Sequence, residues 1–188
     1  MTMEPPASGP DIGSHAHARS LVLVNTGDGK GKSTAAMGVA LRGLARGWRV
    51  LVGQFVKSGE WRSGEHDMLE RLGADWRAVG DGFSWDSDDL QASAALAREA
   101  WHVAAEALAG GTHEVVVLDE VTYPMTWGWL ETDTVVAAIA ERDDRVNVVA
   151  TGRDAPSSLI EMADTVNEMR SLKHAFEAGI LAKRGIDF

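Results

Sequence analysis

The sequence LVLVNTGDGKGKST at residues 21–34 decides the fold of this chain. Its apolar beginning, residues 21–25, predicts a buried strand, and the alanine-rich stretch at 33–45 predicts a helix. The glycines between them allow a turn that directs backbone N–H groups toward an anion, beside the positive end of the helix dipole. The segment is therefore typical of a strand, a phosphate-binding loop and a helix in succession.

The loop itself has the residue types that bind a nucleotide. Lys32 supplies a full positive charge, and Ser33 offers a hydroxyl to Mg²⁺. Gly31, Lys32 and Ser33 fit the end of the pattern G-x-x-x-x-G-K-[ST], but the position five before Gly31 is Thr26, so the first glycine comes one residue late. A glycine-rich connection with solvated lysines is the alternative, and the flanking strand and helix favour phosphate binding. The candidate nucleotide-binding residues of the loop are Gly27, Asp28, Gly29, Lys30, Gly31, Lys32, Ser33 and Thr34.

The rest of the chain alternates short apolar runs with longer helical patterns. The runs that predict five further strands lie at residues 50–56, 74–79, 115–119, 146–151 and 165–169. The patterns that predict four further helices lie at 65–72, 89–109, 132–141 and 156–163. Asp154 is the expected cap of the last helix, ahead of Pro156 in its first turn. Strands apolar enough to be buried on both faces predict an α/β fold, with a mainly parallel six-stranded sheet and helices on both faces.

Length and composition limit the classes of function. The chain has 188 residues, of which 45% are hydrophobic, and this suits one domain over residues 20–188. Residues 1–19 are rich in Pro, Gly and Ser and predict a flexible tail without the apolar core of a signal peptide. The net charge of −10 disfavours general binding to nucleic acid or an anionic membrane. No apolar run is long enough to span a bilayer, and a cytoplasmic location is expected.

A second candidate element follows the apolar run at 115–118, where Asp119 and Glu120 end a predicted strand. At the carboxyl edge of a parallel sheet these carboxylates would lie near the phosphate loop and could bind Mg²⁺ directly or through water. Asp119 could instead cap a following helix. The loop upstream favours the metal role, so Ser33, Asp119 and Glu120 are the candidate metal ligands. The sequence leaves open which of the two carboxylates contacts the ion.

Several motifs together closely resemble the P-loop family of corrinoid adenosyltransferases, from about residue 20 to the C-terminus. They are the loop at 26–34, QFVK at 54–57, GFSWD at 82–86, LDE at 118–120, TGR at 151–153, KHAF at 173–176 and GIDF at 185–188. The resemblance implies a RecA-like P-loop fold, a homodimer, and transfer of the 5′-deoxyadenosyl group of ATP to the cobalt of a reduced corrinoid, with release of triphosphate. Ser33 and Asp28 stand where threonine and asparagine are common in the family.

The resemblance also implies roles for individual residues. Cobalt(I) has no proton to lose, so the reaction needs positioning and charge stabilisation instead of a general base. Lys32 as a catalytic residue, with Lys30, Arg153 and Mg²⁺, would stabilise the charge that develops on triphosphate. Phe83 and Trp85 would pack beneath the corrin, where the lower base would otherwise bind cobalt. The resemblance therefore implies that both residues bind the corrin and take part in catalysis. Without the resemblance, the simpler interpretation is that these two aromatic side chains anchor a loop in the core.

Other expectations are less specific. His174 could contact polar groups of the corrin or make ordinary hydrogen bonds. Trp127 and Trp129, near Tyr123, could form a wall of the corrin pocket or a dimer surface. A reductase or flavoprotein is the expected electron donor.

Two other functions compete with adenosyl transfer. One is phosphoryl transfer, with Glu120 positioning the acceptor. The other is a nucleotide-regulated corrinoid chaperone without chemistry. The sequence does not distinguish complete cobalamin from an incomplete corrinoid as the acceptor.

Overall fold

A computed structural model describes residues 12–13, 15–58, 62–80 and 90–188. The strands are β1 (Val22–Thr26), β2 (Val50–Ser58), β3 (Asp75–Gly80), β4 (Val115–Asp119), β5 (Asn147–Thr151) and β6 (Thr165–Glu168). The helices are α1 (Lys32–Ala45), α2 (Gly64–Arg71), α3 (Leu90–Gly110), α4 (Thr122–Thr126), α5 (Thr132–Ala140) and α6 (Ser157–Met162), followed by the 3₁₀ turn η1 (Phe176–Ala178).

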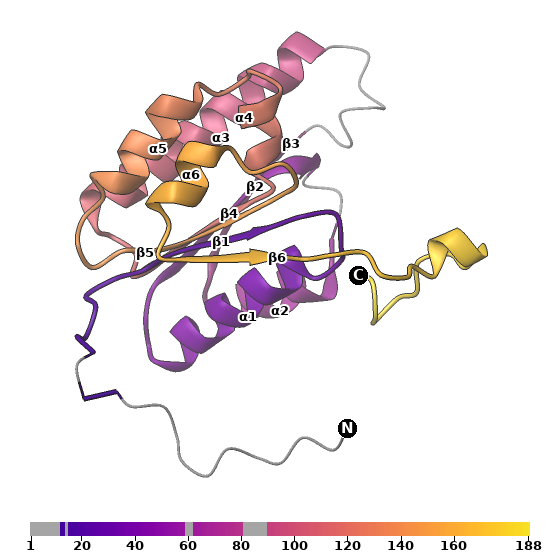
Figure 1. Cartoon of the computed structure of the whole chain (residues 1–188), viewed down its shortest axis with the longest axis horizontal. Coiled ribbons are helices and arrows are strands. Elements are labelled where there is room, and N and C mark those ends of the chain that lie inside the picture. The colour runs from indigo at the N-terminus through magenta and orange to yellow at the C-terminus, as the bar shows by residue number, and fades with distance from the viewer. Residues whose placement is uncertain (1–11, 14, 59–61, 81–89) are drawn as a thin grey trace.

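All six strands pair in parallel, in the order β3-β2-β4-β5-β1-β6. Helices α1 and α2 cover one face of the sheet, and α3, α4, α5 and α6 cover the other (Figure 1). The α/β fold expected from the sequence is confirmed, and every strand pair is parallel. Because parallel strands end at one edge, the loops that follow β1, β2, β4 and β5 meet there.

The core forms two layers because successive side chains of a strand point to opposite faces. Along β4, Val116 and Leu118 pack in the layer of α3 and α5, whereas Val115 and Val117 pack in the layer of α1 and α2. The β-branched side chains suit strands that are covered on both faces. Within the described part of the chain, no helix has the length and apolar character needed to cross a bilayer.

Three local expectations were wrong. All four residues of β6 are exposed, because β6 lies at the edge of the sheet and pairs with β1 alone. Asp154 does not cap α6: its φ of 50° is left-handed, and Pro156 occupies the N-cap without a side-chain hydrogen bond. The alternative in which Asp119 caps a following helix was also wrong: the short helix α4 does follow, but its N-cap is Val121, without a side-chain hydrogen bond.

Glu114 ties together the beginnings of β2 and β4. Its carboxylate accepts hydrogen bonds from the backbone N–H of Arg49 at 2.7 Å and from the Arg49 guanidinium at 2.9 Å. Both bonds lower the pKa of Glu114, from 4.5 to about 2, and the bond from the guanidinium has the larger effect. The ionised form is therefore the one that stabilises the folded chain.

Replacing Glu114→Gln is expected to lower the free energy of unfolding near pH 7 by up to about 1 kcal/mol, since the Arg49 side chain is largely exposed. The stabilisation is complete above the unfolded pKa of 4.5 and is lost as the pH falls toward 2. Denaturant unfolding at several pH values should therefore show the two proteins converging in acid. A difference between the two proteins that stays constant down to acid pH would contradict the assignment.

Candidate functional site

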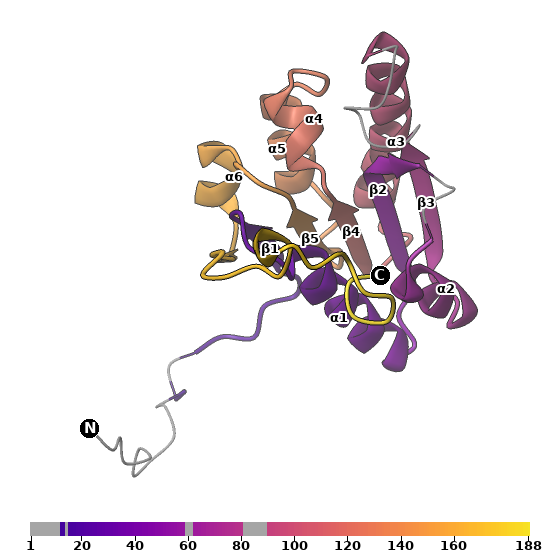
Figure 2. The same cartoon turned by 90° about the vertical axis from the view of Figure 1, so that its right-hand side faces the viewer.

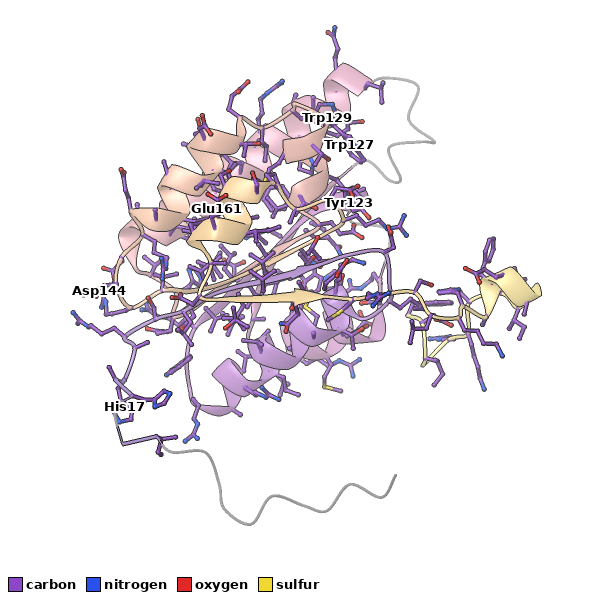
Figure 3. All side chains as sticks on the ribbon, in the orientation of Figure 1. His17, Tyr123, Trp127, Trp129, Asp144 and Glu161 are labelled. Carbon is purple, nitrogen blue, oxygen red and sulfur yellow. The ribbon has the colours of Figure 1, made fainter. Side chains whose placement is uncertain are left out.

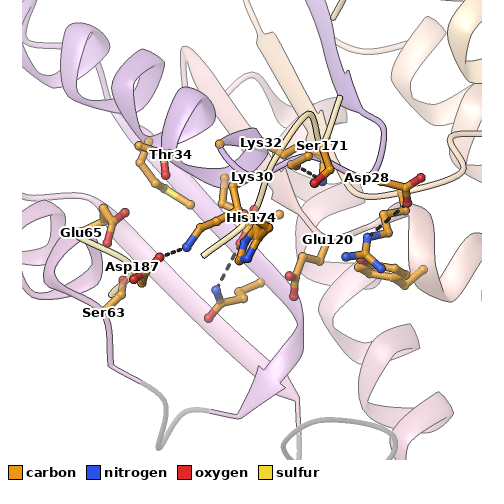
Figure 4. A pocket seen from close by; sticks show the side chains of 18 of the residues that line it. Asp28, Lys30, Lys32, Thr34, Ser63, Glu65, Glu120, Ser171, His174 and Asp187 are labelled. Atoms are coloured by element: carbon orange, nitrogen blue, oxygen red, sulfur yellow. Dashed lines mark hydrogen bonds and ion pairs between the residues drawn. The ribbon is translucent and has the colours of Figure 1, made fainter. Parts of the chain in front are cut away.

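The carboxyl ends of the central strands open onto a cavity of about 630 Å³. Figure 4 shows the side chains that line it. The residues come from the phosphate loop and α1, the ends of β2 and β4, the turn after β5, the C-terminal segment, single positions on β3 and α4, and the start of α2. Segments that are far apart in the sequence therefore form one site.

The glycine loop between β1 and α1 packs tightly against the chain that leaves β6. The N–H of Gly29 donates to the Met169 carbonyl at 2.6 Å. A Cβ atom at Gly27 would lie 2.5 Å from that carbonyl oxygen, and one at Gly29 would lie 2.8 Å from it. Gly27 also has a φ of 89°, in the left-handed region. Glycine is thus required at Gly27 both by its backbone angle and by the neighbouring chain.

Lys32 begins α1 and turns its side chain back into this loop. Its ammonium donates to the carbonyls of Gly27 at 2.6 Å and Gly29 at 2.7 Å. An ammonium has three N–H groups, so a further donor remains for a phosphate oxygen. Burial lowers the pKa of Lys32, and the positive charge of Arg153 lowers it further, against the opposing effects of Asp28 and Glu120. The carbonyls of Gly27 and Gly29 therefore hold the Lys32 ammonium at the centre of the loop.

Most of the residues predicted to bind the nucleotide or the corrin do line the cavity. They are Asp28, Gly29, Lys30, Gly31, Lys32, Ser33, Thr34, Arg153 and His174. Gly27 supports the loop from behind and does not line the cavity.

Arg153 reaches the loop because the turn after β5 is held close to α4. The Thr122 hydroxyl donates to the Arg153 carbonyl at 2.6 Å. At Gly152, which has a φ of 139°, a Cβ would lie 2.0 Å from that hydroxyl oxygen. The guanidinium then lies 3.7 Å from the Asp28 carboxylate. Arg153 therefore partly balances the negative charge that Asp28 brings to the loop.

Asp119 and Glu120 occupy different environments although they are adjacent in the sequence. Asp119 is fully buried, and its carboxylate accepts from the Thr151 hydroxyl at 2.8 Å and from the Gln54 amide at 3.2 Å. Glu120 is half-buried, has a left-handed φ of 64°, and its N–H donates to the Thr151 hydroxyl at 2.9 Å. Both residues line the cavity. The described residues contain no cluster of three His, Asp or Glu side chains arranged to hold a metal ion.

The C-terminal segment crosses the ends of α1 and α2 and forms one side of the site (Figure 2). Asp187 forms an ion pair with Lys30 of the loop and accepts from the N–H of Lys183 at 2.7 Å. Phe188 lines a neighbouring groove with Met37 and Met68, between α1 and α2. The segment therefore contacts both the loop and the helix pair.

The aromatic residues after β4 form a stack beside the cavity. The rings of Tyr123 and Trp127 lie 5.3 Å apart and nearly parallel, and Trp129 meets Trp127 edge-on at 4.8 Å. Figure 3 shows the three side chains on one side of the molecule. Tyr123 lines the cavity, and burial raises the pKa of its hydroxyl. Phe83 and Trp85, the other predicted aromatics, lie outside the described residues.

Sequence reasoning did not assign roles to Gln54, Thr151 or Asp187. Gln54 and Thr151 appeared only within motifs of the family, although both stand on predicted strands whose ends should meet. Asp187 lies 157 residues from its partner Lys30, so no local pattern could connect the two.

Comparisons with known proteins extend over most of the chain. The family model described as ATP:corrinoid adenosyltransferase BtuR/CobO/CobP matches residues 18–188. The chain is 42% identical over 170 residues to the corrinoid adenosyltransferase of Escherichia coli (strain K12), covering 90% of this chain and 86% of the relative. It is 44% identical over 172 residues to the corrinoid adenosyltransferase of Pseudomonas aeruginosa, covering 90% and 84%. The corrinoid adenosyltransferase CobA of Salmonella typhimurium is 39% identical over 170 residues, with coverage of 90% and 86%.

We expect Gly27→Ala to weaken ATP binding by roughly tenfold or more, because the strain of a left-handed alanine costs about 1–3 kcal/mol and the loop must also move away from Met169. Titration calorimetry would measure the affinity. The matched control is Gly38→Ala in α1, where a Cβ meets no atom within 4 Å. This control should bind ATP like the wild type and unfold at a slightly higher temperature. Equal ATP affinity in the two variants would contradict the packing argument.

Proposed function

This chain belongs to the ATP:corrinoid adenosyltransferase family and transfers the adenosyl group of ATP to a corrinoid; we propose that the cavity at the carboxyl edge of the sheet is where it does so. The observation that supports this most strongly is the loop in which Lys32 faces the cavity together with Arg153. A triphosphate is the anion whose size and charge suit that loop.

In the proposed reaction, cobalt(I) of the reduced corrinoid attacks C5′ of ATP. The cobalt–carbon bond forms with the electron pair of the metal, and the bond between C5′ and oxygen breaks, so that triphosphate leaves with the bonding electrons. No proton is transferred in this step, which agrees with the absence of an evident nucleophile and base pair among the described cavity residues. The chain must instead position the two substrates and stabilise the leaving group.

Lys32 is the residue we propose for stabilising the leaving group. Its ammonium, held by the Gly27 and Gly29 carbonyls, has one N–H left to donate to a phosphate oxygen. Lys30 and Arg153 add two further charges from the rim of the cavity, where each is now paired with a carboxylate. The loop amides at the start of α1 bind phosphate without a net charge.

Magnesium fits the donors present. Six carboxylates but only three lysine or arginine cations line the cavity among the described residues, so a tetra-anionic nucleotide needs an additional cation there. The Ser33 hydroxyl and the carboxylates of Asp119 and Glu120 are the hard oxygen donors that Mg²⁺ prefers. We propose that Ser33 and Glu120 bind the ion, and that Asp119, whose oxygens already accept two hydrogen bonds, acts through water. When bound, the ion would neutralise charge on the phosphates.

The corrin would enter from the open side of the cavity. We propose that Phe83 and Trp85 pack beneath it and exclude the lower axial ligand, which eases reduction to cobalt(I). His174 and Tyr123 line the same cavity and offer hydrogen bonds to the polar edge of the corrin. The Phe176 N–H donates to Nδ1 of His174 at 3.1 Å, so the neutral ring has its proton on Nε2.

We also propose a homodimer, a reductase or flavoprotein as electron donor, and a cytoplasmic location, where ATP is available. Leu172, Phe176, Leu181 and Ile186 are at least 70% exposed on the C-terminal segment. Burial of these apolar side chains against a second copy would stabilise a dimer.

The main competing function is phosphoryl transfer with Glu120 positioning the acceptor. The products distinguish the two: an anaerobic assay with chemically reduced corrinoid, ATP and Mg²⁺ should yield triphosphate and an alkylated cobalt(III) spectrum. Formation of ADP instead would contradict adenosyl transfer. If both ligands bind but no alkylated product forms, the chain is a corrinoid-binding chaperone.

Lys32→Ala should lower turnover by roughly 100-fold or more, because a preorganised charge at the leaving group is lost. ATP affinity should fall as well, while the thermal unfolding transition stays cooperative. As a control, Arg46→Ala removes an exposed cation at the other end of α1 and should leave turnover unchanged. Normal kinetics in Lys32→Ala would contradict the phosphate-loop assignment.

The double variant Phe83→Ala with Trp85→Ala should retain ATP binding and lose the corrinoid step selectively. If the rings exclude an axial ligand, the defect is large when a mild reductant must make cobalt(I) on the enzyme. It is small when cobalt(I) is made beforehand, and it shrinks with a corrinoid that lacks the nucleotide base. Spectra of bound cobalt(II) should show the four-coordinate form in the wild type alone. Equal defects with either reductant would restrict the two aromatics to shaping the pocket.

A further inference from the structure

Gln54 is a buried polar residue at the cavity to which the proposed reaction gives no role. It lies on β2 directly beside Asp119, its partner in the parallel register of β2 and β4. Its side chain is only 4% exposed, yet it lines the cavity. Buried amides are rare unless their hydrogen bonds are satisfied, so the partners of Gln54 are informative.

The NH₂ group of the Gln54 amide already has a hydrogen-bond partner. Its Nε2 donates to Oδ2 of Asp119 at 3.2 Å, which fixes the orientation of the amide group. The other half, the carbonyl oxygen Oε1, is buried and has no hydrogen-bond partner among the described residues. A buried acceptor that lacks a partner is unfavourable unless a ligand supplies the donor.

The carboxylate beside it is held from two directions. The Thr151 hydroxyl donates to Oδ1 of Asp119 while accepting from the N–H of Glu120. Gln54 holds Oδ2. Asp119 therefore has a fixed orientation before any ligand arrives, and Thr151 links that orientation to the backbone of Glu120.

The chemistry of this position selects the ligand. Phosphate oxygens of a fully ionised nucleotide only accept hydrogen bonds, so they cannot satisfy Oε1, and the adjacent carboxylate repels them. The ligand must therefore donate a hydrogen bond to Oε1 of Gln54. Because the Asp119 carboxylate is adjacent, a cation close to that ligand is favoured. A water molecule in the hydration shell of a divalent cation meets both requirements, and Mg²⁺ normally keeps several such waters when it binds a nucleotide.

We infer that Gln54 is a positioning residue for the metal site: its NH₂ group orients Asp119, and its carbonyl oxygen accepts a hydrogen bond from the hydration shell of the ion. This inference rests on the magnesium site proposed above. It adds a residue that the ion does not contact directly, and such outer partners commonly change metal affinity by 10–100-fold.

The test measures metal binding separately from turnover. Mn²⁺, which can be followed by the loss of its free electron paramagnetic resonance signal, would be titrated into the protein with saturating ATP. Gln54→Met keeps the length of the side chain but removes both the donor and the acceptor. Its half-saturating Mn²⁺ concentration should rise roughly tenfold or more, whereas its ATP affinity in excess chelator should equal that of the wild type.

Two further variants separate the explanations. Gln54→Glu keeps an acceptor oxygen at this position, so it should weaken Mn²⁺ binding less than Gln54→Met does. Asn147→Leu is the matched control: it removes the hydrogen bonds of a half-buried amide to Leu21 and Glu114, at the end of the sheet opposite the cavity. It should lower the unfolding temperature and leave Mn²⁺ binding unchanged.

Wild-type Mn²⁺ affinity in Gln54→Met would overturn the role of Gln54 while leaving the metal site in place. Weaker ATP binding in chelator would also overturn it, because Gln54 would then contact the nucleotide. Equal losses in the Met and Glu variants would overturn the acceptor role of Oε1. ATP binding by the wild-type protein that is indifferent to Mn²⁺ would overturn the magnesium site itself, and the role of Gln54 with it.

Discussion

The site depends on how closely the glycine loop approaches the main chain at Met169. The Gly29 N–H bonds the Met169 carbonyl, and a side chain at Gly27 would collide with the same oxygen. This contact joins the exit of β1 to the exit of β6, the edge strand that pairs with β1 alone. An otherwise exposed strand thereby supports the loop of the proposed nucleotide site. The loop in turn gains a rigid wall, so the Gly27 and Gly29 carbonyls that hold Lys32 are fixed before a phosphate binds.

Electrostatic balance is the second constraint on the cavity. Carboxylates outnumber lysine and arginine cations along its described lining, and the most deeply buried of them, Asp119, is held by neutral donors alone. A hydroxyl and an amide orient the carboxylate without neutralising it. The arrangement thus keeps a negative charge available beside the loop, which suits a cation that arrives together with the nucleotide.

The sequence was sufficient for the parts of the structure that depend on local pattern. Apolar runs located all six strands to within two residues at each end, and the glycine loop predicted to bind phosphate lines the cavity with Lys32 and Ser33. Contacts that depend on strand register or on the path of the chain could not be predicted. Gln54 meets Asp119 only because β2 pairs beside β4, and Asp187 meets Lys30 only because the C-terminal segment returns across α1. The edge position of β6 likewise follows from strand order, which periodicity does not contain.

The ion pair between Lys30 and Asp187 has a consequence for how the two ends of the domain communicate. Lys30 belongs to the phosphate loop and Asp187 to the segment that continues into the groove between α1 and α2. The ion pair makes binding of a triphosphate at Lys30 less favourable by some coupling free energy. By thermodynamic linkage, a bound triphosphate weakens the ion pair by the same free energy and so releases Asp187. Under the nucleotide site proposed above, this reciprocity would make the C-terminal segment an internal competitor for nucleotide. Local opening of the C-terminal segment can be measured as faster amide hydrogen exchange. Because the segment and the proposed nucleotide site share Lys30, faster exchange would report that the site is occupied.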